Sequence, residues 1–151
     1  MDDGFRYLIA LLDNDLNGRY LSAQAEYDKY NKVDLTDTVI VALEENSPVG
    51  CGCFKQYGHD TVEIKRMFVV PGYRGKGISK LILGGLEVWA EELGYSKAIL
   101  ETGIKQPEAI GLYEKAGYDR IENYGQYRDL PHSICFGKEL ASDRRMFINV
   151  R

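Results

Sequence analysis

A strand–turn–helix segment in the middle of the chain constrains the fold more than any other feature. An apolar run over 67–71 (Met-Phe-Val-Val-Pro) leads into a glycine-rich stretch over 74–79 (Arg-Gly-Lys-Gly-Ile-Ser), and a helical pattern follows over 80–93. The first N–H groups of a helix have no intrahelical partner, and the helix dipole favours anions at that end. Glycines let the backbone approach a ligand closely, while Arg74 and Lys76 add positive charge. The segment therefore predicts a phosphate site.

The composition is that of a globular protein. With 151 residues, 44% hydrophobic and 28% charged, residues 1–151 are expected to form one domain, with 142–151 as a mobile tail or one that reaches a partner. A net charge of −4 without a basic stripe argues against a nucleic-acid partner. No signal peptide is evident, and no apolar run approaches the ~18–20 residues of a membrane span. Three cysteines without a disulfide framework favour the reducing cytoplasm.

Strands and helices are predicted to alternate along the chain, which places it in the mixed α/β class. Ile78, Ile82, Leu86, Trp89 and Leu93 share one face of a helix, so the helix over 76–93 has the strongest signal, with Gly94 as its stop. The other predicted helices cover 15–30 and 107–116, and the predicted strands cover 38–43, 49–56, 61–70, 97–102, 118–122 and 133–139.

Three kinds of phosphate loop compete for residues 74–79. In a P-loop, Gly77 would stand where a Ser or Thr is needed, and in a dinucleotide-binding fingerprint Lys80 would replace the third glycine. The third pattern, Arg/Gln-x-x-Gly-x-Gly/Ala, is matched by Arg74, Gly77 and Ser79, because a serine is small enough for the last position. A glycine-rich turn with solvated charges remains an alternative for these six residues taken alone.

A second motif downstream favours one of these interpretations of the loop. Residues 62–77 together with 100–103 and 106–118 resemble, in order and spacing, the loop of the third pattern and the next strand and helix of the GCN5-related N-acetyltransferases. The resemblance covers about residues 38–140 and is closest to the branch that acts on small amines or amino acids. Gln106 stands where that superfamily commonly has Asn. The first ~35 residues carry no specific match.

The resemblance implies a fold and a donor. The acyl-CoA acyltransferase fold is a mostly antiparallel mixed sheet of six or seven strands, with helices on both faces and splayed fourth and fifth strands. Acetyl-CoA would be the co-substrate: its pyrophosphate would bind the loop, and its pantetheine arm would pair with the exposed strand edge, where a backbone N–H would meet the thioester oxygen. The residues implied are Met67, Phe68, Val69, Arg74, Gly75, Lys76, Gly77, Ile78, Ser79 and Gln106.

The resemblance also implies direct transfer to an amine with two proton movements. Glu63 is the expected general base, directly or through water, unless it merely pairs with Lys65 on the same strand face. Glu101 is the second candidate for the general base. The alternative is that it is an exposed or ion-paired residue at the end of a strand. Tyr113 matches the tyrosine with which this superfamily protonates the departing thiolate. The alternative is that Tyr113 only packs as an aromatic residue of the helix.

The acceptor is expected to be a primary amine of a small molecule. Tyr124, Tyr127 and Arg128 could cradle a substrate carboxylate or form a packed loop. An enzyme that acetylates protein lysines or N-termini and a non-catalytic acyl-CoA-binding module both remain open, as does a homodimer, which is common in this superfamily. No metal is expected, because Cys51 and Cys53 with His59 lack the ligands of a zinc site and are better explained as small core residues.

Overall fold

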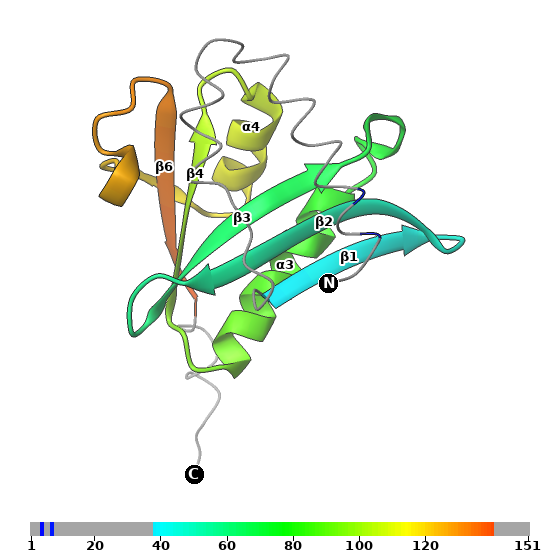
Figure 1. Ribbon diagram of the computed structural model, residues 1–151, viewed down its shortest axis with the longest axis horizontal. Coiled ribbons are helices and arrows are strands. Elements are labelled where there is room, and N and C mark those ends of the chain that lie inside the picture. The colour runs from blue at the N-terminus through cyan, green and yellow to red at the C-terminus, as the bar shows by residue number, and fades with distance from the viewer. Residues whose placement is uncertain (1–3, 5–6, 8–37, 141–151) are drawn as a thin grey trace.

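The structure, a computed structural model, describes Gly4, Tyr7 and residues 38–140. The helix predicted over 15–30 and the tail predicted over 142–151 lie outside the described residues. The elements in chain order are β1 (Thr38–Glu44), β2 (Ser47–Gln56), β3 (Thr61–Val69), the 3₁₀ turn η2 (Pro71–Tyr73), α3 (Ile78–Glu92), β4 (Lys97–Gly103), α4 (Pro107–Lys115), β5 (Asp119–Ile121), η3 (Gly125–Tyr127) and β6 (Ser133–Glu139) (Figure 1). Each predicted strand and helix between 38 and 140 is present, with ends shifted by a few residues at most.

The strands of the described chain form one six-stranded sheet in the order β1-β2-β3-β4-β6-β5. Neighbours run antiparallel, apart from β3 and β4, which are parallel and joined by the crossover helix α3. This arrangement confirms the mixed, mostly antiparallel α/β fold. No helix among the described residues is long and apolar enough to cross a membrane.

The parallel pair separates halfway along its length. The pairing of β3 with β4 begins at Thr61 with Lys97 and ends at Ile64 with Leu100, although β3 continues to Val69 and β4 to Gly103. Beyond that point the two strands diverge, as Figure 1 shows. One edge of β3 remains paired with β2, and none of the strands that the structure describes lies beside its other edge over the last residues of β3. The splay implied by the resemblance is therefore present.

A β-bulge in β3 lies beside the point of separation. The register with β2 shifts between Cys51 and Cys53, so that Arg66 and Met67 face the single residue Gly52. Arg66 has a φ of 61°, in the left-handed region. A Cβ at Gly52 would lie 2.5 Å from Met67 Sδ and 3.0 Å from Ile82 Cγ2, so a larger residue opposite the bulge would displace these side chains.

The two cysteines of β2 support this bulge. Cys51 Sγ donates to the Arg66 carbonyl and Cys53 Sγ to the Lys65 carbonyl, each at 3.3 Å. Both thiols are buried, and no group of three potential metal-ligating side chains occurs within the described ranges. The two thiols thus bond the backbone of β3 at the bulge and next to it.

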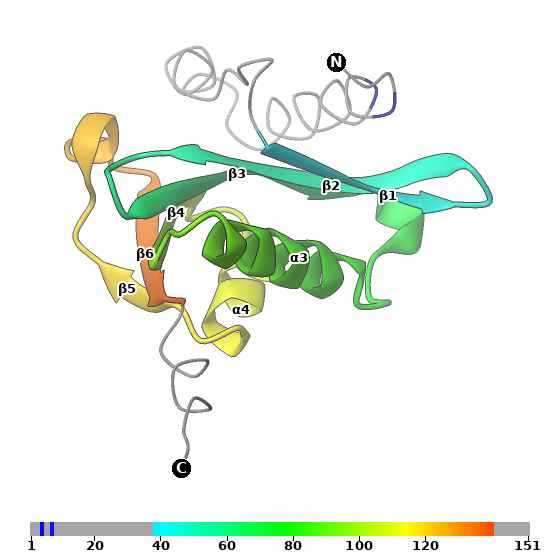
Figure 2. The same ribbon diagram turned by 90° about the horizontal axis from the view of Figure 1, so that it is seen from below.

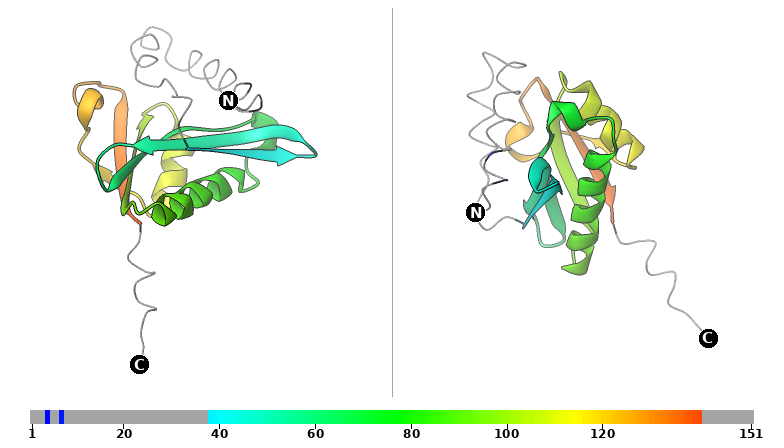
Figure 3. Two further views of the ribbon diagram at one scale, coloured as in Figure 1. Left: turned by 60° about the horizontal axis from the view of Figure 1, so that its bottom comes forward. Right: turned by 90° about the vertical axis from the view of Figure 1, so that its right-hand side faces the viewer.

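Helices α3 and α4 pack on the same side of the sheet (Figures 2 and 3). One core cluster joins them to β2, β3, β4 and β6. The buried residues of α3 are Ile82, Leu83, Leu86 and Ala90. Trp89 and Leu93 were predicted on the apolar face but are 37% and 57% exposed. Trp89 lies beside the row Ile82, Leu86 and Ala90 that packs on the sheet, and Leu93 follows the end of the helix at Glu92. The two α-helices within residues 38–140 thus cover one face of the sheet, and the further helix predicted over 15–30 lies outside the described residues.

Candidate active site

The glycine-rich loop connects β3 to α3 through two residues of left-handed backbone. Gly75 has a φ of 80°, and Gly77, which caps the start of α3, has a φ of 83°. A Cβ at either position would meet no atom within 4 Å, so backbone conformation rather than space requires glycine there. The first turn of α3 carries no acidic residue. The start of α3 therefore keeps the free N–H groups and the positive dipole end that an anion needs.

Two basic side chains are held close to this helix start. Arg74 Nε donates to the Val69 carbonyl at 2.7 Å, and its guanidinium lies 5.3 Å from the centre of the Phe68 ring. Lys76 Nζ lies 5.3 Å from the centre of the Tyr73 ring. The positive charge of the loop is thus placed by contacts with the end of β3 and with η2.

A cavity of about 620 Å³, here called the loop cavity, lies between this loop, the end of β3 and α4. Nine of the ten residues predicted to bind the donor line it: Met67, Phe68, Val69, Arg74, Gly75, Gly77, Ile78, Ser79 and Gln106. Lys76 lines a neighbouring groove along α3 instead. The sequence interpretation did not assign to the donor the other residues that complete the wall, which are Tyr73, Lys80, Pro107, Glu108, Ala109, Gly111, Leu112 and Lys115.

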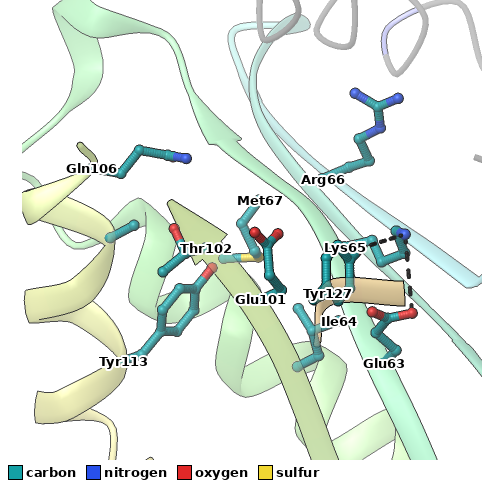
Figure 4. A pocket seen from close by; sticks show the side chains of 11 residues that line it. Glu63, Ile64, Lys65, Arg66, Met67, Glu101, Thr102, Gln106, Tyr113 and Tyr127 are labelled. Atoms are coloured by element: carbon teal, nitrogen blue, oxygen red, sulfur yellow. Dashed lines mark hydrogen bonds and ion pairs between the residues drawn. The ribbon is translucent and has the colours of Figure 1, made fainter. Parts of the chain in front are cut away.

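A second, smaller cavity of about 80 Å³, here called the polar cavity, opens where β3 and β4 part (Figure 4). It is lined by Glu63, Ile64, Lys65, Arg66, Met67, Glu101, Thr102, Gln106, Ala109, Tyr113 and Tyr127. Met67, Gln106, Ala109 and Tyr113 line both cavities. The two cavities therefore meet at the splay, with Tyr113 at their junction.

The carboxylate of Glu63 belongs to a buried network. Glu63 is 1% exposed, and its Oε2 accepts a hydrogen bond of 2.7 Å from the Tyr124 hydroxyl. Lys65 Nζ lies 4.0 Å from Glu63 Oε1 and 3.5 Å from the Tyr127 hydroxyl. Burial lowers the pKa of Lys65, and the negative charge of Glu63 opposes that shift. The pairing expected from the i, i+2 spacing is present, and Tyr124 adds a second restraint.

Glu101 has a different environment, although it lines the same cavity. Its Oε2 accepts a hydrogen bond of 2.7 Å from Ser133 Oγ on the neighbouring strand β6. Removal from water raises the pKa of Glu101 to about 7, while the Ser133 bond and the charge of Lys65 oppose the rise. A carboxyl group with this pKa can gain or lose a proton near neutral pH, which suits a general base.

Tyr113 extends from α4 to the junction of the two cavities. Its ring lies at centroid distances of 5.9 Å from Tyr118 and 6.0 Å from Phe136, so its orientation is fixed by packing. Burial and the negative charge of Glu101 raise the pKa of the Tyr113 hydroxyl above its usual value. The phenol therefore stays protonated and can donate a hydrogen bond.

Of the three other residues predicted near the acceptor, only Tyr127 lines the polar cavity. Tyr127 is buried and lines the polar cavity. Tyr124 lines neither cavity among the described residues; it bonds Glu63 and packs against Tyr57 at a centroid distance of 5.2 Å. Arg128 is exposed and contributes to neither cavity wall. The cations that do line the polar cavity, Lys65 and Arg66, lay inside the matched motif but had no binding role assigned.

Known proteins match both the sequence and the fold. The model of the acetyltransferase (GNAT) family matches residues 6–118. The match therefore includes most of the first ~35 residues, where the motifs had indicated no specific resemblance. An IAA acetyltransferase of Azospirillum brasilense is 37% identical over 106 residues, which cover 67% of each chain. A crystal structure from Klebsiella pneumoniae, described as an acyl-CoA N-acyltransferase, is 30% identical with a TM-score of 0.76, covering 93% of this chain and 92% of that one. A GNAT acetyltransferase of Elizabethkingia anophelis, solved with acetyl-CoA bound, is 21% identical with a TM-score of 0.63, covering 77% and 82%. The chain belongs to the acetyltransferase (GNAT) family.

Proposed function

We propose that this protein transfers the acetyl group of acetyl-CoA to the primary amine of a small molecule by direct attack in a ternary complex. As a member of the GNAT family it is an acetyl-CoA-dependent N-acetyltransferase; the small amine and the residue roles are the proposal. The observation that carries it is the meeting of the loop cavity and the polar cavity at Met67, Gln106 and Tyr113. Two reactants that enter from opposite sides would be brought together at that junction.

The loop cavity is assigned to the donor. Its glycine-rich end and the start of α3 suit the pyrophosphate of coenzyme A, and Arg74 adds charge there. The unpaired edge of β3 over Met67, Phe68 and Val69 can pair with the amides of the pantetheine arm. This placement would put the thioester at the splay, beside the polar cavity.

The polar cavity is assigned to the acceptor and to the two proton transfers. Glu101, directly or through a water, takes a proton from the alkylammonium group. The amine nitrogen then forms a bond to the acetyl carbon. As the carbon–sulfur bond breaks, Tyr113 gives a proton to the departing thiolate, and the second proton of the nitrogen is passed through water to restore the Tyr113 hydroxyl. Glu63 remains the second candidate base, but its carboxylate already accepts from Tyr124 and lies near Lys65, which favours a supporting role.

The same features weigh against the two alternatives. A module that only binds acyl-CoA has no use for an acid–base pair in the wall of the polar cavity, where Glu101 and Tyr113 lie. The polar cavity measures about 80 Å³ and is lined mostly by polar and charged residues, which fits a small polar head group better than a length of peptide.

The proposal is tested by release of free coenzyme A from acetyl-CoA, measured with a thiol reagent across amines, amino acids, polyamines and basic peptides. A thermal-shift titration with coenzyme A runs in parallel, since a ligand of the folded state stabilises it by mass action. At a hundredfold excess over Kd we expect a rise in Tm of roughly 5–10 °C. A Tm rise without turnover of any acceptor would favour the binding module, and fastest turnover with peptides would favour a protein acetyltransferase.

A further inference from the structure

We infer that Ser133, the first residue of β6, is a positioning residue of the active site, whose hydroxyl holds the carboxyl group of Glu101 in the wall of the polar cavity and stabilises its charged form. The inference rests on the proposed function, in which that carboxylate takes the proton of the amine. Ser133 lines neither the polar cavity nor the loop cavity, so it would act on the reaction through Glu101. A hydrogen bond between two strands, and the contacts that fix its donor, carry the inference.

The hydrogen bond follows from the way in which β4 pairs with β6. The two strands run antiparallel, with Glu101 opposite Cys135 and Gly103 opposite Ser133. Ser133 is therefore the diagonal neighbour of Glu101, on the same face of the sheet. Ser133 Oγ donates to Glu101 Oε2 at 2.7 Å, a length typical of a strong hydrogen bond from a hydroxyl to a carboxylate. The register of the two strands thus brings these side chains together.

Backbone hydrogen bonds fix the position of the donor. The Ser133 N–H donates to the Leu130 carbonyl at 3.2 Å, and the Ser133 carbonyl accepts from Asn123 Nδ2 at 3.1 Å. The same amide group donates to the Tyr127 carbonyl at 3.1 Å, which ties the end of η3 to the start of β6. Ser133 is 8% exposed, so little water competes for its hydroxyl. The fold itself therefore holds this hydroxyl in place.

The bond opposes the effect of burial on Glu101. Removal from water favours the neutral carboxyl group and raises its pKa to about 7, whereas a hydroxyl that donates to the carboxylate favours the charged form and lowers the pKa. Without Ser133 the pKa would rise further, and at neutral pH most Glu101 side chains would already carry the proton that they are required to accept. The bond also restrains the side chain, which lies between Tyr113 and Lys65 in Figure 4.

Other charged and titratable groups surround Glu101. They come from β3, α4, η3 and β6, and they are Glu63, Lys65, Arg66, Tyr113, Tyr127 and Cys135. Burial raises the pKa of both tyrosines and that of Cys135, so these three groups stay uncharged near neutral pH. All six remain in a Ser133 variant, so a difference in pH dependence from the unaltered chain reports the lost hydrogen bond.

The experiment measures kcat/KM against pH for the unaltered chain and for Ser133→Ala, by coenzyme A release with the amine that is turned over fastest. The same amine serves throughout, so its own ionisation is equal in every profile. We expect the midpoint of the rising limb to move up by about one pH unit in Ser133→Ala, the worth of a hydrogen bond to a charged group. The rate should fall about 5- to 10-fold at neutral pH and below, and should recover at high pH.

Three further variants show whether the hydroxyl is responsible. Ser133→Thr keeps a hydroxyl and should return the limb to its original pH, while Ser133→Cys carries a weaker donor and should shift it part of the way. Both also carry the test if the alanine variant does not fold. Ser47→Ala, an exposed serine of β2 that lines neither cavity, is the matched control and should leave the profile unchanged. The Tm rise with coenzyme A, measured for every variant, reports an intact donor site.

A double variant shows whether Ser133 acts through Glu101. In a chain that already carries Glu101→Gln, the change Ser133→Ala should lower kcat/KM less than twofold, because the carboxylate that it serves is gone.

Several results would overturn the inference. An unmoved limb in Ser133→Ala would do so, as would a loss that is equal at every pH and persists in Ser133→Thr, since both outcomes would mean that Ser133 only supports the fold. These outcomes leave the proposed function standing. A limb that survives in Glu101→Gln would overturn the role of Glu101 and this inference with it, and absence of turnover with every amine would overturn both proposals.

Discussion

At the scale of single residues, the polar cavity shows how surroundings differentiate two carboxylates of the same type. Glu63 accepts from Tyr124 and lies near a lysine, whereas Glu101 accepts from one serine and has its pKa raised by burial to about 7. Both residues point to the sheet face opposite the core cluster, so position on a strand does not distinguish them. Hydrogen bonds and nearby charges do, and they favour Glu101 as the base.

The first prediction concerns pH. Because the pKa of Glu101 is raised from 4.5 to about 7, the carboxylate form increases as pH rises through about 7, and kcat/KM should rise over the same range. Glu101→Gln should remove this limb and lower kcat/KM about 100-fold or more. Glu63→Gln is the matched comparison and should keep the limb. If the limb vanishes in Glu63→Gln and persists in Glu101→Gln, the roles are reversed.

The raised pKa also has a consequence for stability. The folded chain holds the Glu101 proton more tightly than the unfolded chain, so this residue reduces the free energy of unfolding as pH rises from about 4.5 through about 7. In Glu101→Gln that part of the pH dependence should be absent, as measured by urea unfolding at several pH values.

The second prediction concerns Tyr113. Tyr113→Phe removes the hydroxyl at the cavity junction and keeps the ring that packs on Tyr118 and Phe136, so kcat should fall about 100-fold or more while the Kd for coenzyme A changes little. Tyr118→Phe is the control, because the Tyr118 hydroxyl donates a hydrogen bond to Glu87 and Tyr118 lines neither cavity. It should cost about 1 kcal/mol of stability and leave kcat intact. An unaltered kcat in Tyr113→Phe would exclude its role as acid.

At the scale of elements, the ends of two strands produce the site. β3 separates from β4 after Ile64, and a bulge three residues from the end of β3 directs Arg66 and Met67 to the gap. The following loop then turns into α3 through two glycines with positive φ. One strand end thus presents an unpaired edge, a set of charged side chains and a helix start within a short stretch of chain.

The third prediction belongs to the loop. Gly77→Ala places a Cβ on a residue with a φ of 83°, which should cost about 1–2 kcal/mol by urea unfolding and weaken coenzyme A binding, since it distorts the start of α3. Gly72→Ala is the matched control in the same loop, because Gly72 lacks a positive φ and has open space around its Cβ position. An equal effect of both substitutions on coenzyme A affinity would contradict the explanation.

At the scale of the whole molecule, one core cluster joins the two halves of the splayed sheet. It takes residues from β2 and β3 on one side, from β4 and β6 on the other, and from both helices beneath them. The halves can therefore part at one end and remain one packed body. We propose that the chain unfolds as a single cooperative unit.

The fourth prediction tests this with two leucines of α3. Leu86 is fully buried and Leu81 is 76% exposed, so Leu86→Ala should cost about 2–5 kcal/mol and Leu81→Ala about 0.5 kcal/mol or less. Both variants should unfold in one transition, seen at the same urea concentration by far-UV circular dichroism and by fluorescence. Two separated transitions in Leu86→Ala would show that the halves of the sheet unfold independently.

The sequence by itself determined the order of strands and helices between 38 and 140, the glycine-rich turn that opens α3, and the family. These features are set by neighbouring residues: a strand, a left-handed turn and a helix start are local requirements, and Gly75, Gly77 and Pro107 meet them wherever they occur. The spacing of Glu63 and Lys65 likewise predicted their pairing, because alternation along a strand is local.

Tertiary structure alone decided which side chains share the polar cavity and how each is charged there. Nothing near Glu101 in the sequence indicates that Ser133 bonds it or that burial raises its pKa, and nothing near Arg66 indicates a bulge that depends on Gly52, fourteen positions earlier. Arg128, named with Tyr124 and Tyr127 as a candidate to cradle a substrate carboxylate, is exposed and lines neither cavity. The physical reason is that removal from water and long-range hydrogen bonds depend on what packs over a residue, and strands distant in the chain supply that covering.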